Sequence, residues 1–171
     1  MASEERRGHP REAHREIITR AVWGIGERAF RYSRVIEAAE DAPAERILGT
    51  SLTAAHGPEA QSAAADSGGG RIMVPVTGSF NVNIWYSCDG SRDTRVVKET
   101  IRYAEVIPVE FQGGEALGAA SARAFPMGEP RCLSASVEPD GRLRVELEVA
   151  AKVEVEGDTR ITVQVYSGTR D

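Results

Sequence analysis

The sequence has few of the residues on which catalytic and metal sites are usually built. It contains three histidines and two cysteines in 171 residues, and no CxxC or HxxxH pair. A zinc site would have to collect its ligands from scattered positions. A GxSxG nucleophile motif and a GxxxxGK[ST] phosphate loop are also absent. The sequence therefore predicts no enzyme activity, no metal and no cofactor.

Long apolar runs and an excess of basic charge are missing as well. No segment approaches the roughly 20 apolar residues of a membrane helix, and the start, MASEERRGHPREAHRE, has no apolar signal core. The formal net charge is −5, so no overall basic field would attract nucleic acid or an anionic membrane. We expect a protein that stays in the compartment where it is made, without a nucleic-acid partner or direct membrane insertion.

What the sequence does contain is alternation of apolar and polar residues. From Arg71 to Tyr86 the even positions are apolar except for Gly78, and from Arg142 to Glu156 the odd positions are apolar. This period predicts long strands with one buried face. The fold class we predict is all-β: an antiparallel β-sandwich or curled sheet with long hairpins.

The other segments were assigned from turn residues and local composition. Residues 1–14 are predicted to form a flexible charged arm, 15–167 a single β-rich domain containing a flexible loop at 57–70, and 168–171 the C-terminal end. Within the domain, the pattern predicts two strands with a glycine-marked bend in REIITRAVWGIGERAFRYSRVIEA, a turn at APAER, a strand at RILGTSLTAAH, a hairpin loop at SCDGSRD and a strand at TRVVKETIRYAEVIPVEF.

Five further expectations concern particular positions. Pro75 cannot donate to a ladder, so the first half of its strand is expected at a sheet edge. Residues 112–130 are expected to be irregular, followed by a short strand at RCLSASVEP and a turn at PDGR. A three-residue loop, 157–159, that pairs Val155 with Ile161, or else a bulge that corrects the parity, is expected to join two strands, because a two-residue turn would mismatch their faces.

The stretch GSFNVNIWYS carries the candidate functional residues. Asn81, Asn83 and Trp85 alternate with apolar residues and so share the outer face of their strand. Asn is depleted in strands, whereas side-chain amides and an aromatic anchor suit a protein–protein contact. The alternative is that Trp85 packs beneath a loop or the N-terminal segment. Glu146, Glu148, Glu154 and Glu156 also alternate, and we interpret them as a solvated face rather than a paired acid and base.

The two cysteines form a second candidate site. Cys88 lies at the predicted hairpin loop, where it could be exposed and bridge neighbouring molecules, and Cys132 begins a strand, where it is expected to be buried. Free thiols and intermolecular cross-links are both compatible with the sequence, and free thiols are favoured.

Several ordered segments resemble one protein family. REIITRAV, ILG, GSFNVNIWYS, TRVVKETIRYAEVIPVEF, CLSASVEPDGR and GDTRITVQVY are similar, in this order, to segments of the CotE family of bacterial spore-coat morphogenetic proteins. The resemblance covers most of residues 15–36, 47–56 and 73–167. No single motif is catalytic or diagnostic, but the ordered set is specific.

The resemblance implies a structural, self-assembling scaffold laid around the developing spore in the mother-cell cytoplasm and retained in the spore coat. Its implied partners are itself, inner-coat morphogenetic proteins that recruit it, and outer spore coat proteins that it directs into place. The acidic tail common in the family is not found before Asp171, so recruitment through such a tail is not expected. The alternatives are a carbohydrate- or peptidoglycan-binding β-sandwich that uses Trp85 for stacking, and an enzyme that uses scattered carboxylates.

Overall fold

The computed structural model describes residues 12–61, 64–65, 70–112 and 115–166, and these ranges contain strands and no helix. None of the described residues therefore forms a helix that could cross a membrane. The strands are β1 (Glu12–Ile36), β2 (Arg46–Ala60), β3 (Ala64–Ala65), β4 (Arg71–Cys88), β5 (Asp93–Glu110), β6 (Glu115–Pro126), β7 (Arg131–Val137) and β8 (Leu143–Tyr166).

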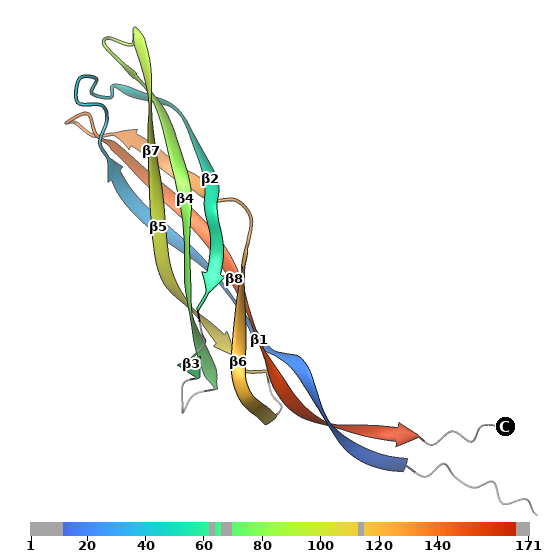
Figure 1. The fold of residues 1–171 in the computed structure, drawn as a ribbon. Coiled ribbons are helices and arrows are strands. Elements are labelled where there is room, and N and C mark those ends of the chain that lie inside the picture. Colours follow the sequence, from blue (N-terminus) through green and yellow to red (C-terminus); the bar gives the residue numbers. More distant parts are fainter. Residues whose placement is uncertain (1–11, 62–63, 66–69, 113–114, 167–171) are drawn as a thin grey trace, which may run out of the picture.

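The strands form two antiparallel sheets (Figure 1). In the first sheet, β8 is central, with β1 along one edge and β6 and β7 along the other. In the second sheet, β4 is central, with β5 on one side and β2 and β3 on the other. β1 lies against β5, and β2 lies against β6 and β7. The predicted all-β antiparallel fold is confirmed.

The core lies between the two central strands, whose predicted alternation is also confirmed. Even positions of β4 and odd positions of β8 face inward, and most of them are inaccessible to solvent. Burying each such side chain contributes about 1.5–3 kcal/mol, and a one-residue slip would expose the whole set. The largest fully buried side chains from these two strands are Tyr86, Phe80, Ile84, Leu143, Leu147, Val74, Val76, Val82, Val145 and Val153.

The N-terminal segment of the domain forms one strand, not the two that we predicted. β1 pairs with β8 from Glu12 to Ile36, interrupted by a single bulge at which Trp23 is the extra residue between Val22 and Gly24. A bulge absorbs a bend without ending the pairing. The bend marked by the glycines is therefore real, but it occurs inside one strand.

Of the predicted 1–14 arm, residues 1–11 lie outside the described residues, and 12–14 belong to β1.

The predicted loop at 157–159 is wrong, because β8 continues through it. Gly157 pairs with Ala21, and Thr159 pairs with Thr19, both on β1. A continuous strand explains why Val155 and Ile161 are both odd-numbered and both on the core-facing side. The strand accepts Gly157 because the ring of Trp23 packs over this position.

The expectation for Pro75 is also wrong, because β4 is the centre of its sheet. Pro75 pairs with Val106 of β5, and its carbonyl accepts a hydrogen bond from the Gln61 amide at 2.9 Å. The nitrogen of a strand residue points to the same side as its carbonyl. The Pro75 nitrogen, which has no hydrogen to donate, therefore faces the junction at which pairing with β4 passes from β2 to β3. β2 ends there at Ala60.

Two segments predicted to be irregular contain strands. β6 occupies much of 112–130, and β2 extends to Ala60, into the predicted 57–70 loop. The hairpin loop after Cys88 is confirmed, with Asp89, Gly90 and Ser91 at positive φ. The turn at PDGR, closed at 138–141, and the short strand β7 are confirmed as well, whereas the turn predicted at APAER lies earlier, at 39–42.

Candidate protein interface on the second sheet

The outer face of the second sheet carries a three-by-three array of side chains, which we call the polar grid. The register of β4 places Trp85 between Gly49 and Val96, Asn83 between Ser51 and Lys98, and Asn81 between Thr53 and Thr100. Directly opposed residues of an antiparallel pair lie on the same face. The grid therefore comprises Gly49, Ser51, Thr53, Asn81, Asn83, Trp85, Val96, Lys98 and Thr100, and its one charged residue is Lys98.

Hydrogen bonds between side chains orient both asparagines within the grid. Thr100 Oγ1 donates to Asn81 Oδ1 at 2.7 Å, and Asn83 Nδ2 donates to Ser51 Oγ at 3.2 Å. These contacts use one polar atom of each amide. Each amide keeps a further donor or acceptor with which it could bind another chain.

Trp85 lies beside the asparagines as a partly exposed aromatic side chain. It is 39% exposed and pairs with Val96, which is 44% exposed. The alternative that Trp85 is covered by a loop or by the N-terminal segment does not fit this exposure. A shallow hollow beside the row is lined by Thr53, Asn81, Asn83, Lys98, Glu99 and Thr100. This lining does not include Trp85.

The outer face of the first sheet has a different character, because acidic residues of β8 lie between arginines of the flanking strands. Glu148 accepts a hydrogen bond from Arg31 Nε of β1 at 3.0 Å and another from Arg131 of β7. Hydrogen bonding to Arg131 and then to Arg31 lowers the pKa of the Glu148 carboxyl. Glu156 is similarly bridged by Arg20 of β1 and Arg123 of β6. Two of the four glutamates of the predicted solvated face, Glu148 and Glu156, thus form cross-strand ion pairs, whereas Glu154 pairs with Lys152 of its own strand.

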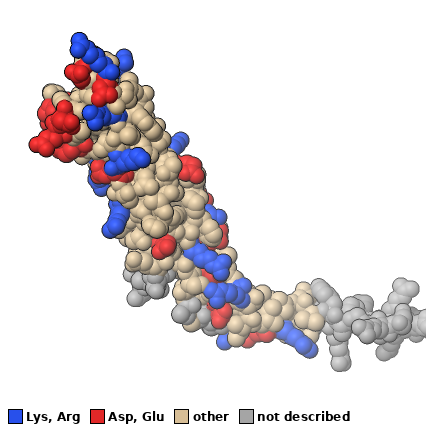
Figure 2. Space-filling view, turned by 45° about the horizontal axis from the view of Figure 1, so that its top comes forward, with Lys and Arg blue, Asp and Glu red and all other residues tan. Residues whose placement is uncertain are grey.

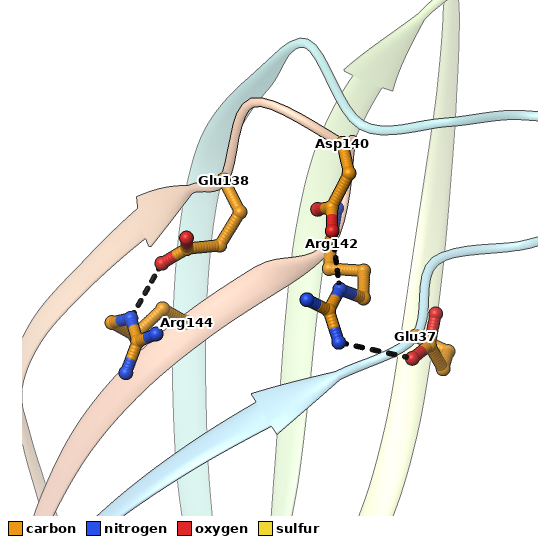
Figure 3. A network of polar contacts seen from close by, with 5 residues as sticks. All are labelled: Glu37, Glu138, Asp140, Arg142 and Arg144. Carbon is orange, nitrogen blue, oxygen red and sulfur yellow. Dashed lines mark hydrogen bonds and ion pairs between the residues drawn. The ribbon is translucent and has the colours of Figure 1, made fainter.

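A further group of ion pairs fastens the β7–β8 turn to the end of β1 (Figure 3). Arg142 Nε lies 2.7 Å from Asp140 Oδ2, and its Nη1 lies 3.8 Å from Glu37 Oε1. Hydrogen bonding from the Arg142 backbone lowers the pKa of Asp140. Figure 2 shows charged side chains gathered at this end of the sandwich and sparser over the middle of the visible face. These exposed ion pairs fix a turn and do not resemble an acid–base pair with separated pKa values.

Comparison with known families identifies the family of the chain. The sequence matches the family of outer spore coat protein E (CotE) over residues 13–171. The chain belongs to the CotE family. No match was found among curated proteins or among solved structures. The resemblance carried by the ordered segments is confirmed, and it makes the chain a member of a family of outer spore coat proteins.

The two cysteines of this CotE-family chain lie in the opposite environments to those predicted. Cys88 is the last residue of β4, faces the core and is 1% exposed, whereas Cys132 on β7 is half-buried. The strand continues two residues further toward the loop than expected, which keeps Cys88 in the inward-facing set. The Cys132 thiol donates to the Ser134 carbonyl at 3.3 Å. Both thiols are free in this single chain.

The remaining candidate ligands are dispersed. His14 lies on β1 and His56 on β2, and among the described residues no three His, Cys, Asp or Glu side chains are grouped to hold a metal ion.

The sequence revealed the central row of the grid but missed its flanks. The β5 members could have been found, because a four-residue loop from Asp89 to Arg92 sets Cys88 against Asp93 and thus Trp85 against Val96. The β2 members could not, because bulges after Ile47 and Ala54 shift the pairing.

Proposed function

We propose that this CotE-family chain is a structural scaffold of the outer spore coat, which assembles with copies of itself and directs other coat proteins into place. The family supports the outer-coat role. In this proposal the protein forms its assemblies in the mother-cell cytoplasm, is recruited by inner-coat morphogenetic proteins and remains in the coat around the forespore. It acts through protein contacts and not through catalysis.

The observation that carries the proposal is the contrast between the two outer faces of the sandwich. Acidic residues of the first sheet are engaged by arginines of the same chain. The polar grid has hydrogen-bonding side chains, an exposed Trp85–Val96 pair and a single charge. Uncharged polar and aromatic side chains cost less to desolvate than paired ions do, and interface cores are depleted in charge. The grid is therefore the face better suited to contact with another protein.

The proposal does not require a large interface. A coat layer contains many copies, so weak contacts that repeat across it reinforce one another. Within each contact, a tryptophan is the residue type that most often contributes a large share of the binding energy. We therefore assign the anchoring role to Trp85 and the orienting roles to Asn81 and Asn83.

Replacing Trp85 tests the proposal, and the first sheet offers a matched control. Phe125 is 37% exposed, close to the 39% of Trp85, and pairs with Lys152 on the outer face of the first sheet. Trp85→Ala should raise the protein concentration needed for assembly by about tenfold or more, while Phe125→Ala should assemble like wild type. Light-scattering mass measures assembly, and circular dichroism reports the fold. Unchanged assembly of a folded Trp85→Ala variant would refute the role of the grid.

A further inference from the structure

The strand β5 forms one margin of the second sheet, and its outer side pairs with no other strand among the described residues (Figure 1). The Phe111 amide donates to the Gly70 carbonyl at 2.9 Å, in the same register as the β4–β5 pairs. Backbone groups of successive strand residues point to opposite sides. Odd-numbered residues of β5 therefore direct theirs toward β4, and even-numbered residues direct theirs away from it. The Val106 carbonyl fits this assignment, since it accepts a hydrogen bond from Arg28 Nη1 of β1 at 3.1 Å.

Both ends of this outer side are protected against pairing. Near the C-terminal end, Pro108 has no N–H to donate, and Arg28 occupies the Val106 carbonyl. At the N-terminal end, the Thr94 amide donates to the Asp93 carboxylate at 2.8 Å. Prolines and charged side chains are among the devices that keep edge strands from joining other chains.

The stretch between the protected ends, Val96–Ala104, is open. All of its residues pair with β4 in one register without a bulge, and at about 3.4 Å per residue it extends over roughly 30 Å. Its even-numbered residues are exposed, and their backbone groups have no hydrogen-bond partner among the described residues: Val96, Lys98, Thr100, Arg102 and Ala104. β2, on the other side of the same sheet, is by contrast interrupted by three register shifts. A regular unpaired edge is a template for an added strand, and we call this stretch the open edge of β5.

Two cations without ion-pair partners lie along the open edge. Lys98 and Arg102 share the outer face of β5, and neither is joined to a carboxylate in the part of the chain that the structure describes. On the first sheet, by contrast, the exposed arginines Arg31 and Arg131 both engage Glu148. A strand added along the open edge would place side chains directly opposite the two cations. Acidic residues at these positions would form the missing ion pairs.

The same two cations disfavour a second copy of β5 as the added strand. Antiparallel pairing of two open edges over their whole length would set Val96 opposite Ala104 of the other copy. Lys98 would then lie opposite Arg102 of the other copy, and a twofold contact would repeat this like-charge pair. Like charges directly opposite each other destabilise a ladder. The charge pattern of the open edge therefore favours an acidic strand over its own copy.

We propose that the open edge of β5 binds an extended segment of a partner protein by strand addition, and that this segment carries acidic residues opposite Lys98 and Arg102. Backbone hydrogen bonds would supply affinity, and the two ion pairs would select the acidic segment. The inference goes beyond the proposed function, because this contact needs neither self-assembly nor the anchoring role of Trp85. It gives the chain a binding site for another protein beside the polar grid.

A synthetic nine-residue peptide, labelled with a fluorophore at one end, tests the proposal. Its alternate residues are valine, and the residues between them are threonine except for glutamates at the two positions that would oppose Lys98 and Arg102. Fluorescence anisotropy with the full chain should show saturable binding. A peptide with lysine in place of both glutamates should bind at least about tenfold more weakly. No binding of the acidic peptide, or equal binding of the two peptides, would overturn the proposal.

A peptide with the sequence of residues 96–104 serves as the model of a second copy. It should bind more weakly than the acidic peptide, because its own cations would face Lys98 and Arg102. Binding as tight as that of the acidic peptide would mean that the open edge pairs with its own copy, and would refute an acidic partner.

Reversing the charges on the protein should reverse the preference between the two designed peptides. The double variant Lys98→Glu/Arg102→Glu should bind the lysine peptide more tightly than the acidic one. The control Arg15→Glu/Arg46→Glu makes the same change in net charge at exposed positions outside the open edge, and should keep the preference for the acidic peptide. Circular dichroism checks the fold of both variants. A Lys98→Glu/Arg102→Glu variant that still prefers the acidic peptide would contradict the assigned contacts.

A change confined to the peptide backbone separates strand addition from charge attraction, and it needs no variant of the protein. In an added strand, alternate amides face β5 and the others face away. N-methylation of the central peptide residue and N-methylation of its neighbour should therefore differ by at least about tenfold in their effect on binding. Equal effects at the two positions would contradict strand addition.

Discussion

The indole of Trp23 lies across the backbone of Gly157, so closely that a Cβ atom at the glycine would be 2.2 Å from the ring. Trp23 is the extra residue of the β1 bulge, and Gly157 lies in the continuous strand β8 that pairs with it. The same ring donates to Thr159 and packs against Phe111. A bulge on one strand and a glycine on the next thus close the core at the end where β1 and β8 extend beyond the second sheet.

Gly157→Ala should destabilise the protein, because the ring or the strand must move to accept a methyl group. We expect a loss of about 1–3 kcal/mol in the free energy of unfolding, the usual cost of overpacking. Gly49→Ala is the control, since a Cβ there meets no atom within 4 Å and should change stability by about 0.5 kcal/mol or less. Urea denaturation measures both. Equal stability of the two variants would contradict the described packing.

The elements predicted correctly were those with strong alternation. The long apolar faces of β4 and β8 determine their register, because an error would expose an entire row of side chains. β6 was missed because EALGAASARAFP consists largely of small residues, whose alternation carries little hydrophobic contrast. The loop predicted at 157–159 follows from the turn propensity of Gly157-Asp158, which the unbroken odd-numbered apolar pattern on either side of it outweighs in the structure.

Tertiary context explains the other differences. Pro75 is tolerated in a central strand because one neighbour ends and another begins beside it, which a sequence pattern does not reveal. The row Asn81, Asn83 and Trp85 was correctly placed on an outer face, but its β2 neighbours depend on bulges. The burial of Cys88 follows from its even-numbered position, because even positions of β4 face inward. Its place next to a predicted loop favoured exposure instead.

Stability should depend on pH through Glu148. Its pKa is lowered in the folded protein by Arg131 and Arg31, so its contribution is complete above the unfolded value of about 4.5 and is lost as the pH falls through the lower folded value. Glu148→Gln should therefore be less stable than wild type at pH 7, and the difference should shrink below pH 4.5. Glu146→Gln, an exposed neighbour on the same strand face, is the control. Thermal unfolding at a series of pH values would contradict this account if the difference stayed constant.

The charge of the grid can be altered at Asn81 without removing the hydrogen bond from Thr100. Asn81→Asp keeps the oxygen that accepts from Thr100 but adds a negative charge. Asn83→Asp adds the same charge opposite Lys98, which can compensate for it, and its carboxylate can accept from the Ser51 hydroxyl in place of the amide donation. Asn81→Asp should therefore weaken assembly more than Asn83→Asp, and added salt should reduce the effect. Light scattering would test this order, and a reversed order would argue against the grid as the contact surface.

The two thiols should react at different rates. Cys132 is half-buried and Cys88 is buried in the core, so maleimide should modify Cys132 first and reach Cys88 only when the protein unfolds. If intermolecular disulfides form in assembled material, Cys132→Ser should abolish them and Cys88→Ser should leave them intact. Peptide mass spectrometry and non-reducing gels measure these outcomes. Cross-links that require Cys88 would mean that β4 opens at its end during assembly.

The measurement that tests the central claim most directly is electron microscopy of the purified chain together with its light-scattering mass, with and without reductant. A non-covalent scaffold of the outer spore coat should form large, ordered particles under both conditions, because its contacts use exposed sheet faces and not disulfides. A monomer at high protein concentration in both conditions would contradict a self-assembling scaffold.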